Sequence, residues 1–146
     1  FGRTGVPHIF AAGDVASFWH PRFGRRLLIE HWRHALAHGA AVGRAMCGLL
    51  EPYDEIPWFW SDQHGVNLQV GGLPLAAERT VLRGSFAARR FTAFHLAGDR
   101  LVGATTVEEG GNMRAALMLM RAGAPVDEQA LADPAVPLRR LVPRGR

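Results

Sequence analysis

The segment Pro57-Trp58-Phe59-Trp60-Ser61-Asp62-Gln63 begins the part of the chain in which the spacing of apolar residues changes to a period of two. Such alternation is typical of β-strands, because successive side chains point to opposite faces of a sheet. Trp58 and Trp60 therefore share one face of a predicted strand. Four further segments have the same character: Asn67–Val70, Arg79–Arg83, Phe91–Leu96 and Leu101–Ala104. The Gly98-Asp99 pair between the last two predicts a tight hairpin.

The strands are followed by a segment with helical spacing. Met113–Arg121 places Ala116, Leu117 and Met120 on one face of a predicted helix. The remainder is interrupted by prolines, which favour short elements and turns. We therefore predict that residues 53–146 form an α+β domain, with a five-stranded antiparallel sheet followed by C-terminal helices.

Upstream of this domain, Ile9-Phe10-Ala11-Ala12-Gly13-Asp14 predicts a short strand that ends at Asp14. Its unbroken apolar run is typical of a strand covered on both faces. In open α/β sheets, ligands bind at the carboxyl ends of the strands. An ionised carboxylate only accepts hydrogen bonds, so Asp14 suits a ligand hydroxyl. The alternative is that Asp14 caps a helix or belongs to a turn.

A helical pattern covers about residues 30–50, after a possible short strand at Arg26–Ile29. The polar connector Glu51–Pro57, with a proline near each end, is the best candidate for a domain boundary. We therefore expect residues 1–52 to be the C-terminal portion of a first domain. The first residues resemble neither an initiator methionine nor a signal peptide, so we expect the chain to begin inside a domain.

Composition restricts the function of the 146-residue chain. Its net charge of +4 is small and is spread along the sequence. A nucleic-acid-binding protein needs positive charge that is clustered on one face, so the composition does not favour this function. The sequence contains no run of about 18 apolar residues, so it predicts no membrane-spanning helix. The single Cys47 cannot form an intrachain disulfide, which suits a reducing, cytoplasmic compartment. Its apolar helical surroundings predict that Cys47 is buried.

Three segments together resemble a known family: Gly13-Asp14, Leu28-Ile29-Glu30-His31-Trp32 and the tryptophan-rich segment that begins at Pro57. They resemble the ferredoxin-reductase branch of the FAD-dependent pyridine nucleotide-disulfide reductases, over nearly the whole chain. That branch includes putidaredoxin reductase, rhodocoxin reductase and the reductases of biphenyl dioxygenase systems. The resemblance implies that residues 1–52 end a Rossmann-like FAD-binding domain. It also implies electron transfer from NAD(P)H through FAD to a small 2Fe–2S ferredoxin.

The resemblance also implies roles for individual residues. Asp14 would bind the ribityl chain of FAD, and the backbone N–H of Val15 would face the phosphate or ribityl region. Trp32 matches a position that contacts the end of the flavin ring, and Glu30 one that accepts a hydrogen bond from the nicotinamide carboxamide. Trp60 matches the aromatic residue near the flavin edge, where electrons leave for the ferredoxin. Judged by composition alone, Trp58 and Trp60 would be core residues.

Two clusters have a functional and a structural interpretation. His31, His34 and His38 share one helical face and could present a metal site. A flavin reductase needs no metal, so we expect them to border the flavin entrance or solvent. Arg22, Arg25 and Arg139 could dock an acidic ferredoxin, or they could belong to solvated surfaces.

The chain contains no Gly-x-Gly-x-x-Gly loop, whereas the family needs two, one for FAD and one for NAD(P). We therefore expect that these 146 residues alone neither bind FAD tightly nor oxidise NAD(P)H. Two alternatives are a non-catalytic module for interaction or homodimer formation, and a flavoprotein resembling the apoptosis-inducing factors.

Overall fold

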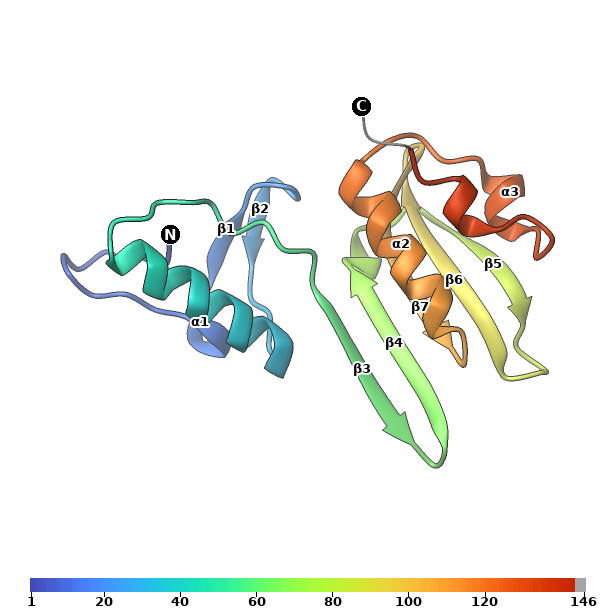
Figure 1. Ribbon diagram of the computed structural model, residues 1–146, viewed down its shortest axis with the longest axis horizontal. Helices are drawn as coiled ribbons and strands as arrows, with labels where there is room; N and C mark the ends of the chain where they lie inside the picture. The colour runs from blue at the N-terminus through green and yellow to red at the C-terminus, as the bar shows by residue number, and fades with distance from the viewer. Residues whose placement is uncertain (144–146) are drawn as a thin grey trace. The chain divides into compact units, whose positions relative to one another are not determined.

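The computed structural model describes residues 1–143, which separate into an N-terminal unit, Phe1–Pro57, and a C-terminal unit that begins at Trp58 (Figure 1). Within these residues, no helix has both the length and the apolar character needed to cross a membrane. Each unit has its own elements and its own buried residues.

The N-terminal unit consists of a short turn, a small ribbon and one helix (Figure 1). The turn is the 3₁₀ segment η1, Gly13–Val15. Strand β1, Phe18–His20, pairs antiparallel with β2, Arg25–Leu27. Helix α1, Trp32–Met46, begins at His31, whose side chain accepts a hydrogen bond from the backbone N–H of His34. This side-chain acceptor satisfies one of the backbone donors that every helix start leaves open.

The predicted buried strand at Ile9–Asp14 does not form, and that prediction is wrong. Phe10 makes a single antiparallel bridge with Arg3, and Ile9 is 54% exposed. A strand needs neighbours for its backbone N–H and C=O groups. Two backbone hydrogen bonds make this bridge, from Ala11 N–H to the carbonyl of Gly2 and from Thr4 N–H to the carbonyl of Ile9, and the pairing extends no further among residues 1–143. Asp14 lies inside the 3₁₀ turn η1. This position agrees with the alternative interpretation, in which Asp14 belongs to a turn.

The C-terminal unit is built on a five-stranded antiparallel sheet, which confirms the predicted α+β class. Its strands are β3 (Trp58–Gln63), β4 (Val66–Gly72), β5 (Arg79–Ser85), β6 (Arg90–Ala97) and β7 (Arg100–Val107). Their spatial order is β3-β4-β7-β6-β5. The hairpin β3–β4 thus joins the meander β5–β6–β7 through pairing between β4 and β7. Gly98 and Asp99 form the tight turn between β6 and β7, as predicted.

Helix α2, Gly110–Ala122, packs on β7 and β4, and α3, Glu128–Ala132, packs on β5 (Figure 1). The predicted helix 113–121 lies within α2. Gly71 on β4 allows the close approach of α2, because a Cβ there would lie 2.8 Å from Met113 Sδ. Two short 3₁₀ turns complete the unit, η2 (Pro74–Ala76) and η3 (Leu138–Arg140).

Cys47 lies at the C-terminal end of α1 and is exposed, so the prediction of a buried thiol is wrong. The helix turns its buried face inward through His34, His38, Val42 and Ala45. Cys47 follows the last helical residue, where the chain leaves that face, and its neighbours Met46, Leu49 and Leu50 are exposed as well.

Candidate functional site

The turn that carries Asp14 is held against helix α1. Gly13 is buried and has φ +72°, a conformation that favours glycine. A Cβ on Gly13 would lie 3.3 Å from the Cβ of Ala35, so the missing side chain also allows the close approach. The backbone N–H of Gly13 donates a hydrogen bond to His38 Nδ1 at 3.3 Å. Asp14 and Val15 remain on the outside of this turn, and Val15 is 81% exposed.

Trp32 lies at the start of α1 and is 70% exposed, and Glu30 just before it is exposed as well. The turn that carries Asp14 packs against α1. Burial lowers the pKa of His31 and of His34, and the negative charge of the nearby Asp14 offsets part of this lowering. The fold therefore brings Asp14, Val15 and Trp32 to the same end of this helix.

The residues at this end of α1 fit the chemistry of a flavin nucleotide. The carboxylate of Asp14 offers acceptors for hydroxyl groups, as a ribityl chain requires. The exposed side chains of Val15 and Trp32 offer apolar and aromatic surface of the kind that binds a flat ring system.

Behind the turn, the N-terminal unit contains a cluster of histidine and aromatic rings. We call this set the histidine cluster: Phe18, His20, His34, His38 and Tyr53. His20, His34 and His38 are at most 2% exposed. The expectation that His34 and His38 border solvent is therefore wrong. Within residues 1–143, no three or more His, Cys, Asp or Glu side chains group in a way that could hold a metal ion.

Hydrogen bonds assign proton positions within the histidine cluster. His20 Nε2 lies 3.0 Å from the carbonyl oxygen of Glu55, so this nitrogen must donate. His34 Nδ1 lies 3.3 Å from the hydroxyl of Tyr53, and its ring stacks on Phe18 with centroids 5.2 Å apart. The carbonyl of Glu55 alone would favour the charged form of His20, but burial outweighs it and lowers the pKa of this ring.

Burial keeps the histidine cluster uncharged at neutral pH. It lowers the pKa of His34 to about 4, with further lowering by the charges of His38 and His31. Burial also lowers the pKa of His20 and of His38. It raises the pKa of Tyr53, and the negative charge of Glu55 adds to that effect.

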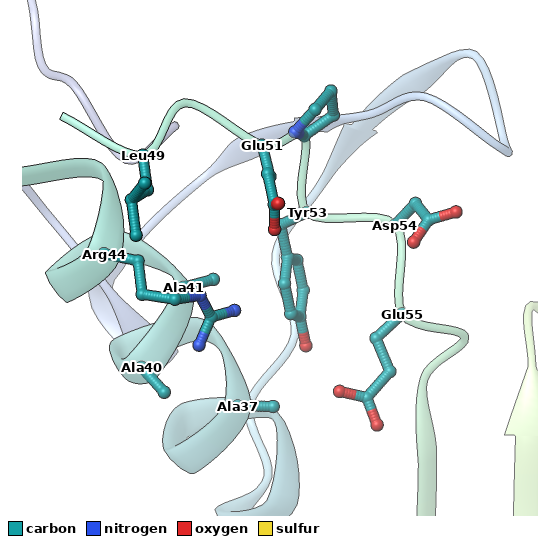
Figure 2. A pocket seen from close by; sticks show the side chains of 10 residues that line it. Ala37, Ala40, Ala41, Arg44, Leu49, Glu51, Tyr53, Asp54 and Glu55 are labelled. Carbon is teal, nitrogen blue, oxygen red and sulfur yellow. The ribbon is translucent and has the colours of Figure 1, made fainter.

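A cleft of about 360 Å³ lies between α1 and residues 49–55 of the connector (Figure 2). Figure 2 shows the ring of Tyr53 between the helix and the connector, with charged side chains around it. Two of the three acidic side chains that line the cleft form ion pairs: Glu55 with Arg33 at 2.6 Å, and Asp54 with Arg22 at 3.3 Å.

In the C-terminal unit, Trp60 lies on the edge strand β3 and is 44% exposed. Its ring lies 5.3 Å from that of Trp58, centroid to centroid, so the two share a strand face as predicted. Trp58 is less exposed and donates from its indole N–H to Gln69 Oε1 at 3.1 Å. That bond anchors Trp58 to the sheet and leaves Trp60 as the more accessible indole.

The three arginines predicted to dock a ferredoxin belong to different units. Arg22 and Arg25 belong to the N-terminal unit, where Arg22 pairs with Asp54. Arg139, on η3, lines a cleft of about 560 Å³ together with Arg83, Arg114 and the start of α2. The cleft is positively charged because three arginines and no acidic residue line it.

Two features escaped the sequence analysis. Tyr53 gives no local signal, because only the fold brings the connector against α1. The contact between His38 and Gly13 joins residues 25 positions apart. The sequence does show that His34 and His38 share a helical face. This spacing alone does not reveal whether that face is buried or exposed.

Residues 58–142 match a protein-family model described as "Reductase C-terminal". The chain belongs to this family. It therefore includes the C-terminal domain of the ferredoxin–NAD reductases related to putidaredoxin reductase and rhodocoxin reductase, as the sequence predicts.

Curated relatives of this reductase family match both units. The ferredoxin–NAD(+) reductase component of the anthranilate 1,2-dioxygenase system of Burkholderia cepacia is 44% identical over 141 residues, 96% of this chain and 35% of the relative. Putidaredoxin reductase of Pseudomonas putida is 32% identical over 140 residues, 96% of this chain and 33% of the relative. The chain thus spans about a third of the length of these relatives.

A solved structure of the same family has the same fold. The covalent putidaredoxin reductase–putidaredoxin complex superposes with a TM-score of 0.91 and 32% identity, over 97% of this chain and 34% of that chain. The likeness covers the elements of both units.

Proposed function

We propose that this chain is the C-terminal part of a flavoenzyme that passes electrons from NAD(P)H through FAD to a 2Fe–2S ferredoxin. The observation that carries the proposal is the 44% identity, across both units, to a protein named as a ferredoxin–NAD(+) reductase component. We further propose that residues 1–52 belong to the FAD-binding domain and residues 53–146 to the reductase C-terminal domain. The cytoplasmic location stays a prediction.

The end of α1 that carries Asp14 and Trp32 would hold the flavin. Asp14 would accept hydrogen bonds from the ribityl hydroxyls, and the backbone N–H of Val15 would face the phosphate or ribityl region. Trp32 would contact the end of the flavin ring, and Glu30 would accept a hydrogen bond from the nicotinamide carboxamide. When bound, FAD supplies the conversion of a two-electron donor into single-electron transfers.

Trp60 would line the route by which electrons leave the flavin. Its exposed position on an edge strand, beside an anchored Trp58, supports this role. The basic cleft at Arg139 supports the docking of an acidic partner, since complementary charge speeds encounter. Arg25 adds exposed positive charge, whereas the charge of Arg22 is partly offset by Asp54.

The test uses the full-length reductase that contains this chain, with its cognate ferredoxin. Trp60→Ala is expected to slow ferredoxin reduction about tenfold and to leave flavin reduction by NAD(P)H nearly unchanged. Stopped-flow absorbance measures both steps. The matched control is Phe59→Ala, because Phe59 is the next residue on β3, has similar exposure and projects from the other face of the strand.

Equal loss of both steps in the Trp60 variant would contradict the exit role. A full-length protein that binds FAD but reduces no ferredoxin would contradict the proposed function.

A further inference from the structure

The hydrogen bond between Gly13 and His38 determines the state of the imidazole. A backbone N–H can only donate, so His38 Nδ1 must accept and cannot carry a proton. The ring proton is therefore on Nε2. His38 is 1% exposed, so solvent does not compete for this bond.

Three rings surround the imidazole of His38 and hold its orientation. The centroid of Phe18 lies 4.6 Å away, and those of His34 and Tyr53 each lie 4.9 Å away. They come from β1, from the preceding turn of α1 and from the connector. Because close-packed rings resist rotation, Nδ1 stays aimed at the backbone of the turn.

We propose that His38 is the positioning residue of the Gly13–Val15 turn: its neutral imidazole holds the turn on α1, so that Asp14 and Val15 face the ligand, and protonation of the imidazole releases the turn. The proposal rests on the proposed flavin site and adds a residue that does not touch the ligand. An imidazolium has no free lone pair on Nδ1, so the bond to Gly13 cannot persist in acid.

Several titratable groups lie around this imidazole. They are Asp14 on the turn, His31 and His34 on α1, His20 on β1 and Tyr53 on the connector. Of these groups, only Asp14 has a carboxylate. Burial lowers the pKa of His38, so release of the turn begins only below pH 6.5.

The first test needs no flavin and uses the 146-residue chain. Nitrogen-15 NMR is expected to show the Nε2–H tautomer of His38 and slow hydrogen exchange at the Gly13 amide. His38→Leu removes the acceptor and should abolish that protection. His38→Asn keeps an acceptor near the position of Nδ1 and should preserve it. The matched control is His20→Gln, because His20 is equally buried in the histidine cluster but bonds Glu55.

The second test measures FAD affinity of the full-length reductase by flavin fluorescence. His38→Leu should weaken binding about tenfold, as expected for one lost hydrogen bond. His38→Asn and His20→Gln should stay within about threefold. Between pH 7.5 and 5, the unmodified protein should lose affinity more steeply than His38→Asn, because asparagine does not titrate.

Unchanged Gly13 protection in His38→Leu, or equal pH dependence in His38→Asn and the unmodified protein, would overturn the proposal. If His38→Leu does not fold, the pH comparison with His38→Asn decides. Failure of the unmodified reductase to bind FAD would refute the flavin site instead. In that case the Gly13 exchange measurement still decides whether His38 holds the turn.

Discussion

The two units bury different kinds of side chain. In the C-terminal unit, the largest side chains that are almost fully buried include Phe94, Leu96 and Met113, whereas in the N-terminal unit they are His20 and His38. An apolar core is insensitive to pH, but a core of imidazoles remains favourable only while these are neutral. The C-terminal unit is therefore stabilised by hydrophobic burial, whereas the stability of the N-terminal unit also requires that its buried histidines stay neutral.

The surfaces differ as well. Among the described residues, eleven of the seventeen exposed large hydrophobic side chains belong to the N-terminal unit, although it is the shorter unit. Exposed apolar surface of this kind marks contact with a ligand or with another part of a protein. This agrees with the proposal that Val15 and Trp32 line a flavin site.

The largest expected effect is a loss of stability when a buried apolar side chain of the C-terminal unit is removed. Phe94→Ala should lower the free energy of unfolding of the C-terminal unit by about 3–5 kcal/mol, because Phe94 is fully buried and its loss leaves a cavity. Urea denaturation followed by circular dichroism measures the change. Leu75→Ala, at a fully exposed leucine, should change stability by less than about 0.5 kcal/mol. Similar losses in both variants would contradict the assignment of the core.

Acid should destabilise the N-terminal unit more than the C-terminal unit. The pKa of His34 is about 4 in the folded chain and 6.5 in the unfolded chain, so only the unfolded state takes up a proton between these values. His34 therefore contributes stability that is complete above pH 6.5 and is lost as the pH falls toward 4. The loss amounts to about 3 kcal/mol.

Hydrogen exchange at pH 7.5 and 4.5 separates the two units. Amides of α1 should lose protection in acid, while those of α2, which carries no histidine, should lose less. His34→Asn should reduce the pH dependence in α1. Equal acid sensitivity of the two helices α1 and α2 would break the comparison.

A smaller loss of stability is expected from a substitution of Arg83, which lies on the edge strand β5 of the C-terminal sheet. The guanidinium of Arg83 donates to the carbonyl oxygens of Leu131, Asp133, Pro134 and Val136 at 2.6–3.3 Å. Arg83→Met should cost about 2 kcal/mol, since it leaves these acceptors without their charged donor. Thermal unfolding measures the loss. Arg114→Met, at an exposed helical arginine, is the control and should be nearly neutral.

The smallest expected effect is at the surface of the N-terminal unit. Glu55→Gln removes the ion pair with Arg33 and should cost less than about 1 kcal/mol, because both side chains are partly exposed. The loss should shrink further in 0.5 M salt. A salt-independent loss above about 2 kcal/mol, measured by urea denaturation, would show that this pair matters more than surface pairs do.

The sequence predicted the C-terminal sheet well and the N-terminal unit less well. Alternation at Trp58–Trp60 and the turn at Gly98-Asp99 are local signals, and both correspond to structure. The apolar run at Ile9–Ala12 is also local, but whether it becomes a strand depends on neighbours that its own residues do not specify. The resemblance located Asp14 and Trp32, and the fold brought them to one end of α1.

By itself, the sequence determined the strands of the C-terminal sheet, the helix periods and the family, because these depend on residue spacing and on short motifs. Only the tertiary structure decided that His34 and His38 are buried, that Tyr53 packs against them and that His38 holds the backbone of Gly13. The physical reason is that burial and hydrogen bonding depend on residues far apart in the chain. A helical histidine stripe has the same sequence pattern whether water or aromatic rings cover it.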